Sequence, residues 1–164
     1  ISGAYFTNSY PKPAMGYLFV KDMLGDDLFY KGLHYYIQQW HGKHPIPWDF
    51  FNCMNVGSGK DLNWFWKKWF FENDITNLSI TKVNTIGKPF VIITNKGGAP
   101  LPVDLKLEFA DGSTSIIHKS VEVWKKENKT ITLSLPTGKK IKKITLGAVH
   151  TPDRDKKDNV WEMK

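Results

Sequence analysis

The sequence predicts an α+β protein in which a helical N-terminal part precedes a small all-β, immunoglobulin-like sandwich. Two observations carry this prediction. Apolar residues recur at spacings of three and four up to about residue 73, and at a spacing of two from residue 78 onward. The charged residues are also distributed unevenly between the two parts of the sequence. Residues 1–74 hold 7 lysines and 7 acidic residues, whereas residues 75–164 hold 15 lysines, 1 arginine and 9 acidic residues, the whole net charge of +7. We therefore expect two domains, 1–74 and 75–164.

About four helices are expected in the first domain. The first begins at Pro13, because a first helical turn leaves the N–H that proline lacks without a partner anyway, and it ends at Gly25. The second begins at Asp26 or Asp27, either of which can cap it, and ends at Gly42. The faces expected to be buried contain Met15, Leu18 and Phe19 in the first helix and Phe29, Leu33, Ile37 and Trp40 in the second.

Two shorter helices follow an extended link at residues 44–47, where each proline disfavours helical backbone in the residue before it. The third helix runs from Trp48 to Asn55 and is followed by Gly-Ser-Gly at residues 57–59. The fourth is capped by Asp61. Its apolar face is so aromatic that we expect part of it to pack against polypeptide outside this chain. That face contains Leu62, Phe65, Trp66, Trp69 and Phe70.

The second domain alternates apolar and polar residues, as strands with one wet face do. Turn signals separate these stretches, for example Asp-Gly at residues 111–112 and Thr-Gly at residues 137–138. About seven short strands at this spacing predict an antiparallel sandwich. The expected strands are 78–80, 90–93, 103–109, 116–117, 121–123, 131–135 and 141–146.

Residues 10–14 read Tyr-Pro-Lys-Pro-Ala and form the stretch with the clearest chemical interest. Tyr10 is expected in a loop just before a helix, and the two prolines stiffen that loop by fixing φ. A tyrosine hydroxyl is a neutral hydrogen-bond donor, and a positioned neutral donor suits an oxyanion site. From these residues alone, a tyrosine that merely stacks under its own loop is an equally open interpretation.

The order of motifs resembles the C-terminal part of aminopeptidase N and leukotriene-A hydrolase-type zinc metallopeptidases, the gluzincins. In that family Tyr-x-Lys-Gly or Tyr-x-Lys-Pro-Ala opens a helix, which residues 10–14 match. Met-Leu-Gly-Asp at residues 23–26, Lys-His-Pro-Ile-Pro-Trp-Asp-Phe at residues 43–50 and Ser-Gly-Lys-Asp-Leu-Asn-Trp-Phe-Trp at residues 58–66 follow in family order. Residues 95–103, 111–113 and 153–161 resemble landmarks of the family's β domain.

This resemblance implies that residues 1–74 are the second half of a thermolysin-like catalytic domain. It implies a parent protein that binds zinc and hydrolyses N-terminal residues from peptides. Tyr10 would donate a hydrogen bond to the tetrahedral oxyanion. Tyr5 would line the substrate cleft, although a structural role is an open alternative. Lys12 belongs to the motif without a chemical step that we can name.

No zinc site is expected in this chain. The family's metal motif places two histidines four residues apart on one helix face, and the residue four positions after His34 is Gln38. His41 and His44 run into Pro45, which breaks helical geometry. The single cysteine, Cys53, is best explained as a small core residue.

Three interpretations therefore stay open. The first is an inactive fragment of a zinc aminopeptidase, whose partners would be a peptide substrate and the missing N-terminal part of the same polypeptide. The start at Ile1 rather than at methionine favours a fragment. The second is a family scaffold that has lost catalysis. The third is a basic β-sandwich binding module, centred on lysines at residues 139–143. We expect no nucleic-acid partner and no membrane span, and the sequence indicates no compartment.

Overall fold

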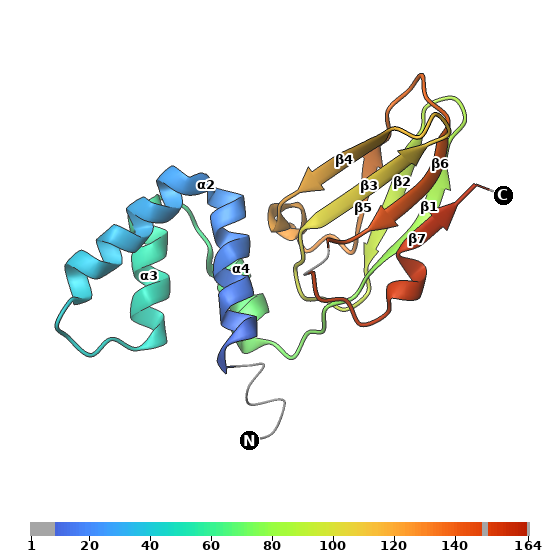
Figure 1. Cartoon of the computed structure of the whole chain (residues 1–164). Coiled ribbons are helices and arrows are strands. Elements are labelled where there is room, and N and C mark those ends of the chain that lie inside the picture. Colours follow the sequence, from blue (N-terminus) through green and yellow to red (C-terminus); the bar gives the residue numbers. More distant parts are fainter. Residues whose placement is uncertain (1–8, 149–150, 164) are drawn as a thin grey trace. The chain divides into compact units, whose positions relative to one another are not determined.

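A computed structural model describes residues 9–148 and 151–163. The chain divides into two compact units, Ile1–Glu72 and Asn73–Lys164. Among these described residues, three α-helices lie in the first unit and two antiparallel sheets lie in the second (Figure 1). The described residues therefore confirm the mixed α+β class. The units divide two residues before the predicted domain boundary between residues 74 and 75.

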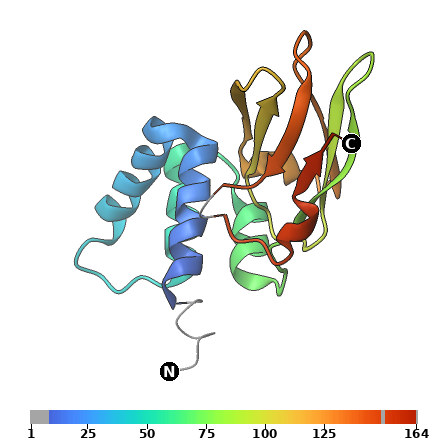
Figure 2. The same cartoon turned by 45° about the vertical axis from the view of Figure 1, so that its right-hand side comes forward.

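Helix α2 (Pro11–Trp40) contains both of the first two predicted helices. Gly25 lies within it at φ 74° and ψ 166°, which is not helical backbone. Glycine adopts this positive φ without the steric penalty that a Cβ brings. The helix therefore bends sharply at Gly25 into two arms, as Figures 1 and 2 show. The predicted interruption is correct, but it is a kink rather than two separate ends.

Helix α3 (Pro47–Ser58) begins at the proline that the sequence indicated and continues three residues beyond the predicted end. Asp49 in its first turn accepts a hydrogen bond from the backbone N–H of Ile46, at 2.9 Å. A carboxylate at this position satisfies an otherwise unpaired donor and interacts favourably with the helix dipole. Gly59 ends the helix in the left-handed region at φ 68°.

The fourth predicted helix is a short α-helix followed by a π-helix. Helix α4 covers Asn63–Trp66, and η1 continues it over Lys67–Phe71. Asp61 does accept a hydrogen bond from Asn63 N–H at 3.0 Å, although it lies one residue before the N-cap. The Glu72 N–H bonds to the Lys67 carbonyl, an i→i+5 contact that defines the wide turn.

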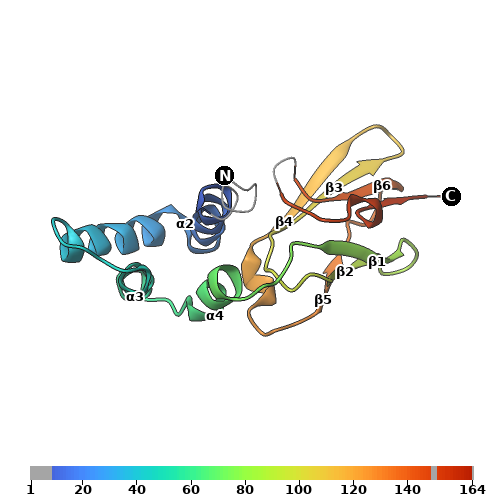
Figure 3. The same ribbon diagram turned by 90° about the horizontal axis from the view of Figure 1, so that it is seen from below.

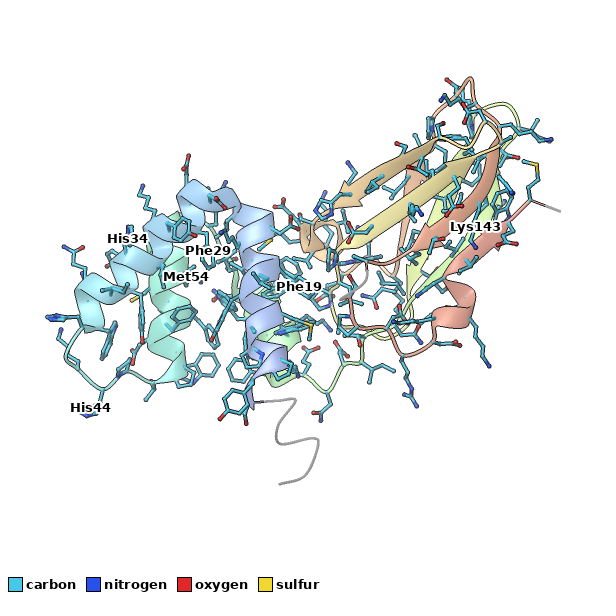
Figure 4. The ribbon with its side chains drawn as sticks, in the orientation of Figure 1. Phe19, Phe29, His34, His44, Met54 and Lys143 are labelled. Carbon is cyan, nitrogen blue, oxygen red and sulfur yellow. The ribbon has the colours of Figure 1, made fainter. Side chains whose placement is uncertain are left out.

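The second arm of α2 meets α3 at two glycines. A Cβ added to Gly57 would lie 2.7 Å from the Gly32 Cα, and one added to Gly32 would lie 3.1 Å from the thioether of Met54, which Figure 4 labels. Small residues let the helix backbones approach this closely. Of the apolar face predicted for this helix, Phe29, Leu33 and Trp40 are partly buried. Ile37 is half exposed, because α2 turns its Gly32 face toward α3. Leu18, also predicted as buried, is largely exposed.

The second unit contains a three-stranded sheet in the order β1-β2-β5 and a four-stranded sheet in the order β4-β3-β6-β7, all pairs antiparallel. Figure 3 shows β3, β4 and β6 in one layer and β1, β2 and β5 in the other. The strands are β1 (Leu78–Asn84), β2 (Phe90–Asn95), β3 (Val103–Phe109), β4 (Thr114–Lys119), β5 (Thr130–Ser134), β6 (Ile141–Leu146) and β7 (Val160–Glu162).

Alternation along β2, β3 and β6 explains the core of this unit. In β3 every second residue is buried, and the residues between them are half-buried or exposed. This is the period of a strand with one wet face. The fully buried core of the unit contains Val91, Ile93, Val103, Leu105, Leu107 and Ile144.

The prediction of a strand at 121–123 is wrong. Residues Val121–Trp124 form the 3₁₀-helix η2, in which Val121 and Trp124 are both buried. A 3₁₀-helix has three residues per turn, so side chains three apart point the same way. The Trp124 indole N–H also donates to the Leu101 carbonyl at 2.8 Å. The seventh strand is instead β7, within the terminal segment that the sequence had not assigned to a strand.

Candidate functional site

Tyr10 lies immediately before α2, at the N-cap position of that helix. Its side chain is 65% exposed. Its backbone carbonyl accepts the first hydrogen bond of the helix, from Ala14 N–H at 3.1 Å. The phenol of Tyr10 is therefore carried by the rigid end of a helix and is accessible from outside the helical unit, as the sequence anticipated for a loop residue before a helix.

A tryptophan side chain donates a hydrogen bond to the backbone of the first turn of α2. Trp69, in η1, donates a hydrogen bond from its indole N–H to the Lys12 carbonyl at 2.9 Å. The Trp69 side chain is only 2% exposed. Lys12 follows Tyr10 by two residues, so this bond fixes the backbone next to the candidate catalytic tyrosine.

Aromatic rings and a glycine surround the Trp69 indole. Phe65 stacks on it with ring centroids 6.0 Å apart, and Phe19 contacts it edge-on at 5.3 Å. Figure 4 labels Phe19 on the first arm of α2. Gly16 approaches so closely that an added Cβ would lie 2.6 Å from Cδ1 and Nε1 of the indole. The sequence indicated Trp69 only as part of an apolar face; its spacing gives no sign of a bond to residue 12.

Tyr17 is a second tyrosine on the first arm of α2, and its ring lies 5.2 Å from that of Phe50. Burial raises the pKa of Tyr17, and the nearby Tyr36 adds to that increase. The Tyr17 phenol therefore stays protonated at neutral pH. Its aromatic contacts mark it as a packing residue of the helical unit.

The other two residues that the sequence analysis considered beside Tyr10 are Tyr5 and Lys12. Tyr5 lies outside the described residues, so its role as a cleft residue stays a prediction. The Lys12 side chain is half-buried, and its carbonyl is the Trp69 acceptor already described.

The histidines of the helical unit do not form a metal site. Within residues 9–148 and 151–163, no three His, Cys, Asp or Glu side chains are grouped as metal ligands. Figure 4 shows His34 on the second arm of α2 and His44 in the link beyond it, well apart. Zinc therefore does not fit the residues that this part of the chain supplies.

Cys53 is buried on α3, as expected for a core residue. Burial raises the pKa of its thiol, which disfavours the thiolate that nucleophilic or metal-binding cysteines require. His118 in the β unit lies 2.7 Å from Asp104 through Nδ1, across the β3–β4 pair. Cys53 is therefore a packing group of α3, and His118 forms a surface pair with Asp104.

A groove in the helical unit lies between its two longer helices. It is a groove of ≈ 680 Å³ between the second arm of α2 and the end of α3. Tyr10 is not among the residues that line this groove. The lining includes Asp27, Lys31, His34, Tyr35, Val56 and Gly59.

The lysines at residues 139–143 are partly neutralised by neighbours. Lys139 lies 2.9 Å from Asp111, and Lys143, labelled in Figure 4, lies 2.8 Å from Glu162. The hydrogen bond to Glu162 raises the pKa of Lys143, and the same pair lowers the pKa of Glu162. These are ordinary ion pairs of a wet strand face. They leave less unbalanced charge for an acidic partner than the sequence alone implied.

Comparison with known proteins gives a similarity in fold to solved structures. No family model and no curated protein matches the sequence. Among solved structures, the chain is similar to an aminopeptidase A of Legionella pneumophila in complex with aspartic acid, with a TM-score of 0.58 and 21% identity. The similarity covers 77% of this chain and 15% of that chain. At this identity the similarity concerns the fold alone: this chain has the fold of a small part of an aminopeptidase.

None of the described helices combines the length and the apolar character that crossing a membrane requires.

Proposed function

We propose that this chain is the C-terminal fragment of a zinc-dependent aminopeptidase, a gluzincin, which hydrolyses N-terminal residues from peptides. Tyr10 is the residue of this fragment that takes part in the chemistry. It donates a hydrogen bond to the oxyanion of the tetrahedral intermediate. The helical unit is the second half of the thermolysin-like catalytic domain.

One observation carries the proposal: the exposed phenol of Tyr10 at the rigid start of α2. A donor stabilises a transition state best when it is already in place, because no reorganisation is needed as charge develops. The proline at the first helical position and the Trp69 bond to Lys12 both restrict the backbone next to Tyr10. The motif order of the sequence and the similarity in fold to part of an aminopeptidase support the same assignment.

Zinc is bound by other residues of the parent protein in this proposal. The described residues offer no group of three ligands, and a catalytic zinc site takes three protein ligands. The chain spans 15% of the aminopeptidase that it resembles, which leaves room elsewhere in a parent of that size for the metal site and the general base.

The missing N-terminal part of the same polypeptide is the proposed partner of the helical unit. Trp48 and Phe71 stack in parallel with ring centroids 4.4 Å apart, yet they remain 53% and 49% exposed. Ile46, two residues before Trp48, is also exposed. Large apolar side chains at the surface are typical of a face that packs against further polypeptide. We propose that the rest of the catalytic domain covers them.

The β unit is proposed to be an immunoglobulin-like sandwich. An immunoglobulin constant domain has strands A, B and E in one sheet and C, F and G in the other. Here the first, second and fifth strands share one sheet, and the third, sixth and seventh share the other. The fourth strand pairs with β3 instead of extending the first sheet, which distinguishes this sandwich from the constant-domain arrangement.

The test of this function is Tyr10→Phe in the parent protein. Loss of one oxyanion donor is expected to lower kcat by roughly 10²–10³-fold, with zinc content unchanged, measured on an aminoacyl anilide. Tyr30→Phe is the matched control, because Tyr30 is a partly exposed tyrosine on the same helix whose hydroxyl contacts Lys21. The isolated chain with added zinc gives the baseline and is expected to show no turnover.

Two results would contradict the proposal. If Tyr10→Phe and Tyr30→Phe retain the same kcat, Tyr10 has no part in the reaction. If the parent protein neither binds zinc nor cleaves any N-terminally free peptide, it is a scaffold that has lost catalysis.

A further inference from the structure

We propose that Trp69 is the positioning residue for Tyr10: its indole N–H and ring set the orientation of the helix turn that presents the phenol. This inference rests on the proposed function of Tyr10. Trp69 itself touches no reacting atom. Its effect would act through the backbone of residues 10–12.

The first turn of α2 is bonded both within the helix and to a side chain outside it. Pro11 and Pro13 carry no N–H, so neither can donate a hydrogen bond to a preceding residue. Ala14 N–H reaches the Tyr10 carbonyl. The Trp69 indole N–H reaches the Lys12 carbonyl at 2.9 Å and so connects this turn to a distant part of the sequence. It joins residues that are 57 positions apart.

The indole is held in place from several directions. Phe65 lies almost parallel to it, at an interplanar angle of 9°, and Phe19 contacts it at 78°. Gly16 also packs against the indole, which occupies the space that a Cβ at residue 16 would take. A side chain packed this closely transmits its position to the atoms that it bonds. The Lys12 carbonyl therefore has a defined location relative to η1.

The π-helical turn at Lys67–Phe71 is the element that carries Trp69. Two lysines, Lys67 and Lys68, pair with the carboxylate of Glu72 at its end. Single π-turns are rare and occur often at functional sites, where the wider turn redirects side chains. In this chain Trp69 lies in the π-turn and contacts the start of α2.

Trp66 provides a matched control, since it is the same residue type in the same short helix. It is also 2% exposed. Its indole N–H donates to the Asn55 side chain at 3.2 Å, which ties α4 to α3 and not to the Tyr10 turn. If Trp69 were only a core residue, phenylalanine at either position would have the same consequences.

The experiment compares Trp69→Phe and Trp66→Phe in the zinc-loaded parent protein, with 3-fluorotyrosine at position 10 for ¹⁹F NMR. We expect Trp69→Phe to lower kcat by about 10- to 100-fold, the range for a small misplacement of a catalytic group, with KM changed less than about 3-fold. Its ¹⁹F resonance should shift or broaden. Trp66→Phe should destabilise the protein similarly but leave kcat and the ¹⁹F resonance unchanged.

A third variant removes the N–H alone. Trp69→benzothienylalanine keeps the ring size and replaces the donor with sulfur, so it stays interpretable if Trp69→Phe fails to fold. It should reproduce the ¹⁹F change and part of the loss in kcat. Equal effects of the Trp69 and Trp66 variants on both measurements, or no effect of the Trp69 variants, would overturn the inference. Unchanged kcat in Tyr10→Phe would instead reject the proposed function, while the ¹⁹F shift would still report whether Trp69 positions residue 10.

Discussion

At the scale of single residues, the surroundings of Tyr10 restrict its backbone more than its side chain. Pro11 occupies the first helical position, and the Tyr10 carbonyl accepts from Ala14. The phenol remains largely exposed. This combination suits a group that must meet a substrate with little cost in entropy, because the chain around it is ordered before binding.

Gly16 gives a prediction at this scale. In Gly16→Ala the new methyl would lie 2.6 Å from the Trp69 indole and 3.3 Å from Phe70 Cζ, so the indole must move. We expect a loss of unfolding free energy of about 1–3 kcal/mol, as for other overpacked cores, measured by urea denaturation. We also expect a lower kcat in the parent protein.

Gly57→Ala is the control for that prediction. Its methyl would also overlap neighbours, lying 2.7 Å from Gly32 Cα and Tyr35 Cβ, but at the crossing of α2 with α3. It should cost stability without lowering kcat once the protein is folded. A Gly16→Ala protein of full stability and full activity would show that the packing around Trp69 is looser than described.

At the scale of elements, Asn55 links α3 to α4. Its Oδ1 accepts from the Leu62 backbone N–H at 3.3 Å and from the Trp66 indole at 3.2 Å. Its Nδ2 donates to Asn63 at 2.8 Å. One half-buried side chain therefore fixes the turn between two helices.

Asn55→Ala is expected to destabilise the helical unit by about 2 kcal/mol or more, because partly buried donors lose their acceptor. Asn55→Asp keeps the acceptor oxygen and loses only the bond to Asn63, so its loss should be clearly smaller. Urea denaturation of the three proteins measures the difference. Equal stability of the alanine variant and the native protein would mean that these bonds do not hold the helices together.

Element boundaries were largely predictable where a single residue enforces them. Pro47 begins α3 and Gly59 ends it, because each has a backbone preference that is independent of tertiary contacts. The bend at Gly25 was indicated for the same reason. The strand predicted at 121–123 was wrong because the short apolar pattern fits either period, and the 3₁₀-helix buries both Val121 and Trp124, whose indole bonds to Leu101.

The buried face of α2 was not predictable in the same way. An apolar stripe through Ile37 suggested one face, whereas contact with α3 occurs at Gly32. Which face of a helix is covered depends on its partner, and glycine gives no apolar signal. The Trp69 bond to Lys12 also escaped sequence analysis, since residues 57 positions apart share no local pattern.

At the scale of the whole molecule, the net positive charge and the candidate catalytic residue lie in different units. Residues 75–164 carry the entire net charge of +7, and some of their lysines, such as Lys143, are paired with acidic residues. The candidate catalytic residue lies in the helical unit. The location of Tyr10 at a helix start followed from its sequence context. The metal site could not be derived, because the described residues contain no ligand group.

The central claim is that Tyr10 bonds to an oxyanion that exists only in the transition state. Its most direct test is the affinity of a phosphinic dipeptide, whose tetrahedral phosphorus resembles that state, for the native parent protein and for Tyr10→Phe. We predict that the variant binds this analogue more weakly by about the factor lost in kcat/KM, while its affinity for the product amino acid is unchanged. Equal affinity of both proteins for the phosphinic dipeptide would contradict the assignment of Tyr10.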